Sequence, residues 1–287
     1  MRDLERAPGL LIALGGLTDR VRERDLLRAF YEASGGPDAS LVVLAMAAEP
    51  AEVRDLGLAA ERFGDVFYDL GAESVEVLRL GSLSGRSRLD LLEFATGLFL
   101  AGGGGSPSWL PLSGELELGE LVRRRHQEGM AVGGNGAGAA VLAERCIAPA
   151  SPSANPGRRR PLGLSPGLGL APGMLLDCPV RQRDRLSRLL NALAVDTTPL
   201  ALGIDEDTAV LLEPQAGFEV LGAGAVTVIN AAQASSPGTA PGAEVPPMLG
   251  LKVDILTDGC RYDLRERRAV PGRVHGSIVA NPGEWRT

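Results

Sequence analysis

Short apolar runs alternate with amphipathic stretches throughout the first half of the chain, and this alternation constrains the fold more than any other feature. Apolar runs at 10–14, 41–46, 75–80, 97–103 and 130–134 precede helical patterns at 22–34, 51–70, 88–95, 115–128 and 137–147, respectively. Buried parallel strands are apolar along their whole length, and parallel neighbours need crossover connections that are usually helices. The alternation predicts an α/β fold with a doubly wound, mostly parallel sheet flanked by helices.

The second half of the chain has a different pattern. Residues 151–167 have the composition of a loop, and the amphipathic residues 181–195 predict a helix. Short β-rich segments divided by glycine turns follow, which favours antiparallel strands, and residues 231–250 are typical of a flexible surface insert. We interpret 1–287 as one domain. A parallel α/β core over 1–150 is extended by 151–287, which adds the helix and the antiparallel strands.

Charge and composition disfavour several classes of partner. The formal net charge is −7, and an acidic surface repels phosphate backbones, so nucleic acid is not an expected partner. No apolar run approaches the ~20 residues that span a bilayer, so we expect no membrane partner either. The three cysteines are widely separated, and two lone histidines do not make a metal site. We expect a cytoplasmic protein with reduced thiols, no metal and no cofactor. His126 lies at the C-terminus of a predicted helix, where a cation interacts favourably with the helix dipole, so we expect it to cap that helix.

The segment at 130–146, MAVGGNGAGAAVLAERC, carries the strongest functional signal. Its composition predicts a strand, a sharp glycine turn and a helix, which is the geometry of a nucleophile elbow. Such an elbow holds a nucleophile above the sheet, where backbone N–H groups and a helix dipole can stabilise an oxyanion. The centre of an elbow needs a serine or a cysteine, but Gly136 has no side chain.

Several blocks along the chain resemble the cyanophycinase-type serine peptidases. Residues 134–139, GNGAGA, stand where that family has GTSAGA, and 98–110 are similar to its GGDQ loop. Residues 167–190 resemble the family's GLGLLPG…DQHFxxRxRxxRL block, and 201–212 resemble its GIGIDExTA strand. The resemblance implies a class I glutamine amidotransferase-like or flavodoxin-like fold, a dimer, and a serine exopeptidase that acts on β-linked aspartyl peptides.

The residues at the family's catalytic positions depart from that pattern. The resemblance places Gly136 at the nucleophile position, between Asn135 and Ala137, and Pro179 at the histidine position, while Glu206 matches the triad acid. The implied substrate-binding positions hold Gly104, Gly105, Asp177, Cys178, Arg183, Arg185 and Arg188. Without a nucleophile and its base, acyl-enzyme chemistry has no route. We therefore expect an inactive homologue that binds a small peptide or a partner, either as a homodimer or as a heteromer with an active paralogue.

Three alternatives stay open on the sequence. A relocated nucleophile, Cys178 or Ser106, could sustain peptidase activity with Glu206 retained. Residues 134–139 also fit a G-x-G-x-x-A nucleotide-binding fingerprint, although this run follows the fifth strand rather than the first. Asp205 or Glu206 could instead pair with the arginines of 181–188 in a structural ion network.

Overall fold

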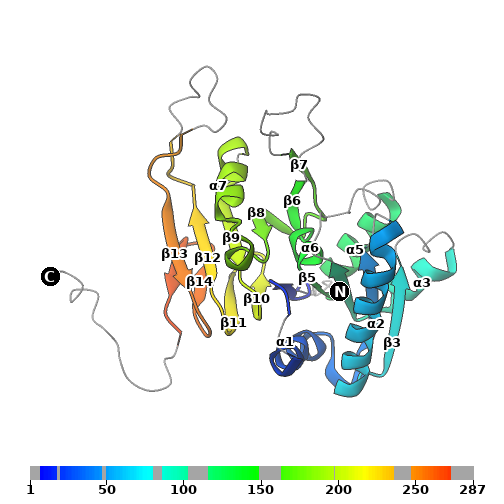
Figure 1. The fold of residues 1–287 in the computed structure, drawn as a ribbon. Coiled ribbons are helices and arrows are strands. Elements are labelled where there is room, and N and C mark those ends of the chain that lie inside the picture. Colours follow the sequence, from blue (N-terminus) through cyan, green and yellow to red (C-terminus); the bar gives the residue numbers. More distant parts are fainter. Residues whose placement is uncertain are drawn as a thin grey trace, which may run out of the picture.

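Two β-sheets and their flanking helices make up the computed structural model of the chain (Figure 1). The structure describes residues 7–17, 20–46, 50–79, 86–102, 116–148, 163–196, 198–235 and 247–272. Among the described residues, no helix combines the length and the apolar character needed to cross a bilayer.

The larger sheet has nine strands in the order β15-β14-β11-β10-β1-β5-β4-β2-β3. Its parallel part consists of β1 (Leu11–Leu14), β5 (Ala131–Asn135), β4 (Gly97–Gly102), β2 (Ser40–Met46) and β3 (Ser74–Arg79). Its antiparallel part consists of β10 (Thr208–Glu213), β11 (Gly217–Gly222), β14 (Arg261–Asp263) and β15 (Arg268–Val270). The apolar runs of the first half thus form the predicted parallel strands.

A second sheet of six strands, in the order β13-β12-β9-β8-β6-β7, was not predicted as a separate sheet. Parallel pairing joins β6 (Ala143–Ala148), β8 (Ala171–Asp177) and β9 (Leu200–Ile204). Antiparallel pairing adds β7 (Gly163–Pro166), β12 (Val226–Asn230) and β13 (Lys252–Leu256). The second half of the chain therefore contributes parallel as well as antiparallel pairs.

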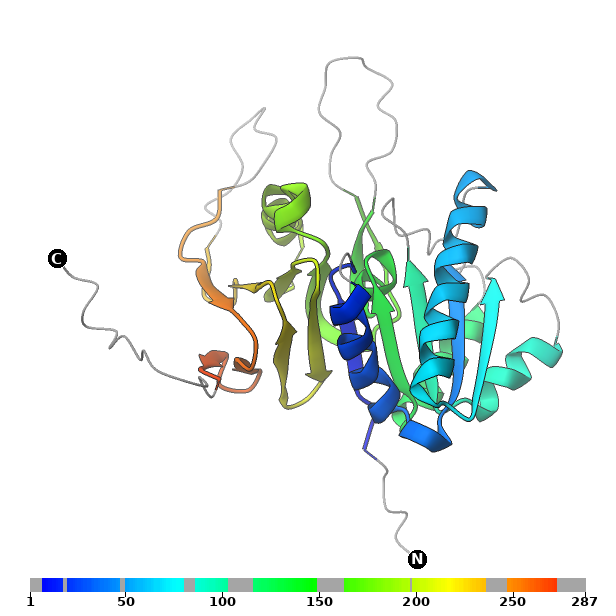
Figure 2. The same cartoon turned by 60° about the horizontal axis from the view of Figure 1, so that its bottom comes forward.

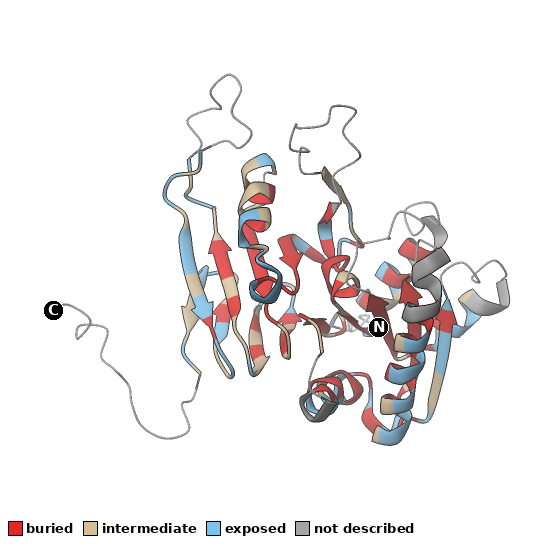
Figure 3. Cartoon of the chain, in the orientation of Figure 1, coloured by how far each residue is buried: buried red, intermediate tan, exposed pale blue. Residues whose placement is uncertain are grey.

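Three apolar layers hold the two sheets and the helices together. Helices α1 (Arg20–Ala33) and α2 (Pro50–Leu70) lie over one face of the larger sheet (Figure 2). The rings of Phe30, Phe67 and Phe99 pack together in this layer. A central core joins the two sheets and takes in α3 (Arg86–Phe94) and α5 (Leu116–Gln127). Helix α7 (Leu186–Val195) covers the outer face of the smaller sheet, and the buried residues follow these layers (Figure 3).

Three predicted elements are corrected by the structure. The helix predicted at 137–147 is only α6 (Ala137–Ala140), because the following residues extend as β6 and pair with β7 and β8. The helix predicted at 181–195 begins at Leu186, after a short 3-10 turn, η3 (Arg181–Arg183), and a left-handed residue, Asp184. The end of the loop predicted at 151–167 is strand β7. At β6 and β7 strand pairing overrides local helix or loop propensity, whereas the late start of α7 follows from the left-handed conformation of Asp184.

The insert predicted at 231–250 is only partly within the described residues. Ser235 and Leu249 form an isolated antiparallel bridge, which closes the base of this segment. Residues 236–246 lie outside the described residues, so the predicted flexibility remains a prediction.

Candidate active site

The carboxyl ends of parallel strands from both sheets meet at one place. Gly136, after β5, accepts a hydrogen bond from the Cys178 thiol, after β8, at a Sγ–O distance of 3.0 Å. Gly15, after β1, packs so closely on the segment after β9 that an added Cβ would lie 1.9 Å from Asp205 O. Ligands on α/β sheets bind beyond the carboxyl ends of strands, so this junction is the expected place for a site.

The glycine turn after β5 has the backbone of a nucleophile elbow. Gly136 has φ 53° and ψ −118°, and its N–H donates to Leu14 O at 2.9 Å. This region of positive φ is strained for residues that carry a Cβ, and elbow nucleophiles occupy such a strained turn. The chain therefore keeps the strained backbone at position 136, but a glycine adopts it without the usual cost.

Close backbone packing explains the neighbouring glycines. A Cβ at Gly134 would lie 2.4 Å from Gly138 O, and a Cβ at Gly138 would lie 2.1 Å from Leu100 O. Asn135 stabilises the same turn, since its Oδ1 accepts a hydrogen bond from the Gly102 N–H at 3.0 Å. These positions require glycine for space, whatever chemistry the turn performs.

The short helix after the turn weakens two of the sequence-based expectations. Helix α6 has four residues, so it contributes little of the dipole that was expected to support an oxyanion. A dinucleotide site also uses the N-terminus of a full crossover helix, which the chain does not provide after 134–139. The fingerprint at 134–139 is accounted for by tight packing at the elbow.

Cys178 is placed beside the elbow but is held as a neutral thiol. Its side chain is 3% exposed and donates to Gly136 O. Burial raises the pKa of Cys178 far above its usual range, and the neighbouring Asp177 carboxylate raises it further. A cysteine acts as a nucleophile through its thiolate. Pro179 follows in a buried position and has no group that could accept a proton.

Asp177 is buried at the end of β8 and is paired with two arginines. Its Oδ1 lies 3.3 Å from Arg188 Nη2 and 3.6 Å from Arg185 Nη1. Burial raises the pKa of Asp177 although both guanidinium groups lower it. Arg185 also donates to Cys178 O and Arg188 to Ile147 O, so backbone carbonyls hold both side chains in place. Arg183 lies on η3 and is exposed.

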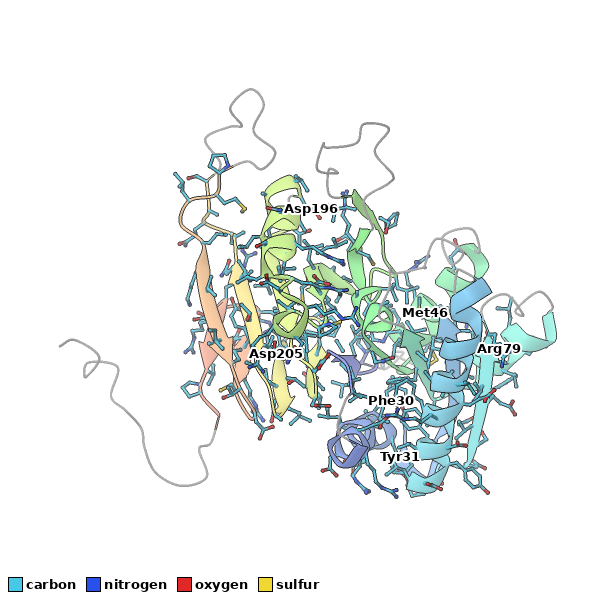
Figure 4. All side chains as sticks on the ribbon, in the orientation of Figure 1. Phe30, Tyr31, Met46, Arg79, Asp196 and Asp205 are labelled. Carbon is cyan, nitrogen blue, oxygen red and sulfur yellow. The ribbon has the colours of Figure 1, made fainter. Side chains whose placement is uncertain are left out.

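The predicted ion network with the arginines of 181–188 is confirmed for Asp205, whereas Glu206 is not part of it. Asp205 Oδ2 accepts hydrogen bonds from Arg181 Nε at 2.8 Å and from the Ala225 N–H at 3.2 Å (Asp205 is labelled in Figure 4). Glu206 is half-buried, and its backbone N–H donates to Gln182 Oε1 at 3.2 Å. Within the described residues, the Glu206 carboxylate has no ion pair and accepts no hydrogen bond.

A cavity of about 540 Å³ opens next to Asp205, between η3, α7 and the strands β12 and β13. Its lining combines apolar side chains, two threonine hydroxyls and charged groups at the rim, contributed by Val180, Leu186, Ile255, Thr227, Thr257, Arg181 and Asp184. Sequence reasoning missed Arg181 and Asp184 as lining residues because the run RQRDR was interpreted as one helix. Asp184 and its neighbours leave helical geometry, and no composition signal marks that change.

Two further sequence-based expectations are resolved differently. His126 is 1% exposed at the end of α5, and its Nδ1 donates to Met130 O at 3.3 Å. Burial lowers the pKa of His126, so the predicted cation at the helix end is wrong. Gly104, Gly105 and Ser106 lie outside the described residues.

A strand–turn–helix elbow at the carboxyl end of the internal strand β5, in a mostly parallel sheet flanked by helices, places the chain among α/β proteins. The model of Peptidase family S51 matches residues 10–219, and the chain belongs to this family. A cyanophycinase from Synechococcus elongatus is 35% identical over 90% of this chain and 80% of its own length. A cyanophycinase from Trichormus variabilis is 31% identical over 96% of this chain and 92% of its own length.

Solved structures show the same fold at low sequence identity. A peptidase from an acI-B1 actinobacterium superposes with a TM-score of 0.59 at 17% identity, covering 90% of this chain and 98% of that chain. A putative peptidase E from Listeria monocytogenes gives a TM-score of 0.53 at 14% identity, covering 76% of this chain and all of the other. The fold is peptidase E-like, of the class I glutamine amidotransferase type, as the sequence predicted.

Proposed function

We propose that this chain is a non-hydrolytic member of Peptidase family S51 that binds a short peptide where the strand ends meet. The observation that carries the proposal is Gly136, which has the backbone of an elbow nucleophile and no atom that can attack a carbonyl. An oxyanion hole and substrate binding alone leave only about 10³–10⁴-fold acceleration over water. For an amide bond, that acceleration does not amount to useful turnover.

The neighbours of Gly136 support the proposal. A Ser–His mechanism needs a proton acceptor, and the histidine position is occupied by Pro179. Cys178 lies close enough to be considered as a substitute nucleophile, but burial keeps it protonated. Ser106, the other candidate nucleophile, lies outside the described residues, so a fluorophosphonate probe is the direct test of its reactivity.

The proposed ligand is a short peptide that carries both signs of charge, of the β-linked aspartyl-arginine type. Arg181 at the cavity rim has its Nε engaged by Asp205, which orients the guanidinium, and its side chain is 71% exposed. A guanidinium oriented in this way suits a carboxylate ligand. Asp184, on the same rim, supplies a carboxylate for a guanidinium or an ammonium group. The volume of the cavity is in the range of small-ligand sites.

Substitution of Arg181 tests peptide binding independently of hydrolysis. Calorimetry with β-aspartyl-arginine dipeptide should detect binding to the wild-type chain, and Arg181→Gln should weaken it by about 1.5–3 kcal/mol, the size of a charge-assisted hydrogen bond. The exposed Arg261, which pairs with Glu219 on another part of the surface, gives the matched control Arg261→Gln. Binding equal in both variants would contradict the assignment of Arg181.

Restoring the missing groups tests the assignment of the elbow. Gly136→Ser alone should add no hydrolysis, since the new hydroxyl has no base, whereas Gly136→Ser with Pro179→His should raise it above the wild-type level. The double variant should lose this gain when Glu206→Ala is added. Hydrolysis by the wild-type chain at the level of the restored variant would contradict the proposal.

A further inference from the structure

A second cavity lies at the end of the smaller sheet that is opposite the candidate active site. Its volume is about 400 Å³, in the range of small-ligand sites. The end of α7, the segment that leads into β9 and the segment that follows β12 form its walls. The cavity beside Asp205 lies at the other ends of these elements, where Leu186 begins α7 and Ala225 precedes β12. Asp196 and Asp205, both labelled in Figure 4, mark the two ends.

Hydrogen bonds hold the walls of this second cavity in place. The Ala231 N–H donates to Pro199 O at 2.8 Å, and the Ala234 N–H donates to Ala231 O at 3.0 Å. Most of the lining is apolar, contributed by Leu193, Ala194, Pro199, Ala231, Ala234 and Met248. The second cavity is therefore preformed, and its walls suit an aliphatic group.

Asp196 supplies a carboxylate to this lining at the end of α7. Its side chain is 4% exposed, and its Oδ2 accepts a hydrogen bond from Thr198 Oγ1 at 2.8 Å. Arg145 Nη1 lies 3.8 Å from Asp196 Oδ1, which is too far for a hydrogen bond. A carboxylate has about four acceptor positions, and the last carbonyl groups of a helix add partial negative charge. This end of the second cavity therefore suits a cationic group.

Arg267 supplies the opposite charge from the turn between β14 and β15. Asp263 Oδ1 fixes this turn by accepting hydrogen bonds from the N–H groups of Arg265 and Glu266, both at 2.8 Å. Arg267 has φ 50°, a left-handed conformation that glycine or asparagine usually adopts, so the backbone does not explain an arginine here.

The guanidinium of Arg267 is available to a ligand. Arg267 is exposed, and within the part of the chain that the structure describes it forms no hydrogen bond and no ion pair. A guanidinium binds a carboxylate through two parallel hydrogen bonds, which makes carboxylates its preferred ligands. The second cavity thus combines a site for an anion, a site for a cation and apolar walls.

We propose that this second cavity binds a free aliphatic α-amino acid. The α-carboxylate pairs with Arg267, the α-ammonium group with Asp196, and the aliphatic side chain packs on the apolar walls around Leu193 and Met248. A zwitterion provides a partner for both charges of the lining, whereas an amine or a carboxylic acid leaves one of them without a partner. The proposed site goes beyond peptide binding and does not depend on it, since the two cavities share no lining residue among those described.

Calorimetry with three ligands tests the pairing of both charges. L-leucine should bind to the wild-type chain. Isocaproate, which is leucine without the ammonium group, and isoamylamine, which is leucine without the carboxylate, should each bind roughly tenfold or more weakly. An analogue that binds as tightly as L-leucine would overturn the proposal, and so would the absence of any binding of L-leucine at millimolar concentration.

Substitution of Arg267 tests whether L-leucine binds in this cavity. Arg267→Gln should weaken binding roughly tenfold or more, because the α-carboxylate loses its charged partner. The neighbouring Arg268 is also exposed but does not line the cavity, so Arg268→Gln should bind L-leucine like the wild type. Arg267→Gly should weaken binding to the same extent and stay as stable toward urea as the wild type, because glycine adopts a positive φ without strain. Equal binding by Arg267→Gln and the wild type would overturn the proposal.

Filling the cavity gives an independent check. Ala232 lines the cavity and is exposed, so Ala232→Trp should occupy the space of the ligand and abolish the binding of L-leucine. Gln233 is the next residue, is exposed and does not line the cavity, so Gln233→Trp is the matched control and should leave binding unchanged. Binding that is unaffected by Ala232→Trp would place L-leucine elsewhere on the chain and would overturn the assignment.

Discussion

Replacing Gly136 with alanine should destabilise the fold, and the size of the effect follows from the backbone. At φ 53° and ψ −118° a Cβ is strained by about 1–3 kcal/mol. A Cβ also restricts the unfolded chain, which favours folding by about 0.4–1 kcal/mol. The free energy of unfolding should therefore fall by about 1–2 kcal/mol, equivalent to a decrease in Tm of roughly 2–4 °C for each kcal/mol.

Two other glycines provide the controls for this measurement by urea unfolding. Gly119 lies inside helix α5, where an added Cβ comes only within 3.4 Å of the flexible Arg123 guanidinium, so Gly119→Ala should stabilise the chain by about 0.5–1 kcal/mol. Gly134→Ala should cost more than Gly136→Ala, because its Cβ would overlap backbone atoms. A Gly136→Ala variant as stable as Gly119→Ala would refute the conclusion that the elbow backbone is strained.

Three further predictions concern side chains around the site. Burial lowers the pKa of His126 in the folded chain, so the unfolded chain binds the proton first as the pH falls below about 6.5. The free energy of unfolding, measured with urea, should therefore decrease as the pH falls below that value. The His126→Gln variant should lack this part of the decrease. Iodoacetamide should label the partly exposed Cys260 in the native chain and leave Cys178 and Cys146 unmodified. Burial raises the pKa of both thiols, that of Cys146 to about 12, so neither forms the reactive thiolate. Rapid labelling of Cys178 in the native chain, detected by mass spectrometry, would contradict the buried thiol. Asp205→Ala should cost about 1–3 kcal/mol of stability by urea unfolding, because the Ala225 N–H and Arg181 lose their acceptor; a neutral effect would contradict the network.

Sequence periodicity predicted the parallel core because four of its five strands, β1, β2, β4 and β5, are buried on both faces. An uninterrupted apolar run such as 41–46 fits few other structures, and it forms β2, which lies between β4 and β3 in the larger sheet. The second sheet could not be predicted in the same way. Residues Ala143 to Ala148 include good helix formers, and the long-range pairing of β6 with β7 and β8 makes them extended.

The glycine turn at the centre of the candidate site could be predicted from the sequence, but the electrostatics around it could not. The sequence identified Asp177, Arg185 and Arg188 together, and the structure brings the two partly exposed arginines to the buried Asp177. It did not separate Arg181, which turns away to Asp205 because Asp184 leaves helical geometry. The separation of Arg181 from Arg185 and Arg188 depends on the positive φ of Asp184, and an aspartate in a sequence predicts such a conformation only weakly.

The most direct test of the central claim is the rate at which the purified wild-type chain hydrolyses β-aspartyl-arginine dipeptide, followed as released arginine by mass spectrometry. Because position 136 has no attacking atom, release should equal that of a Glu206→Ala variant and stay at the level of the buffer alone. Steady turnover by the wild-type chain that disappears in Glu206→Ala would show that another group performs the attack, and would contradict the account.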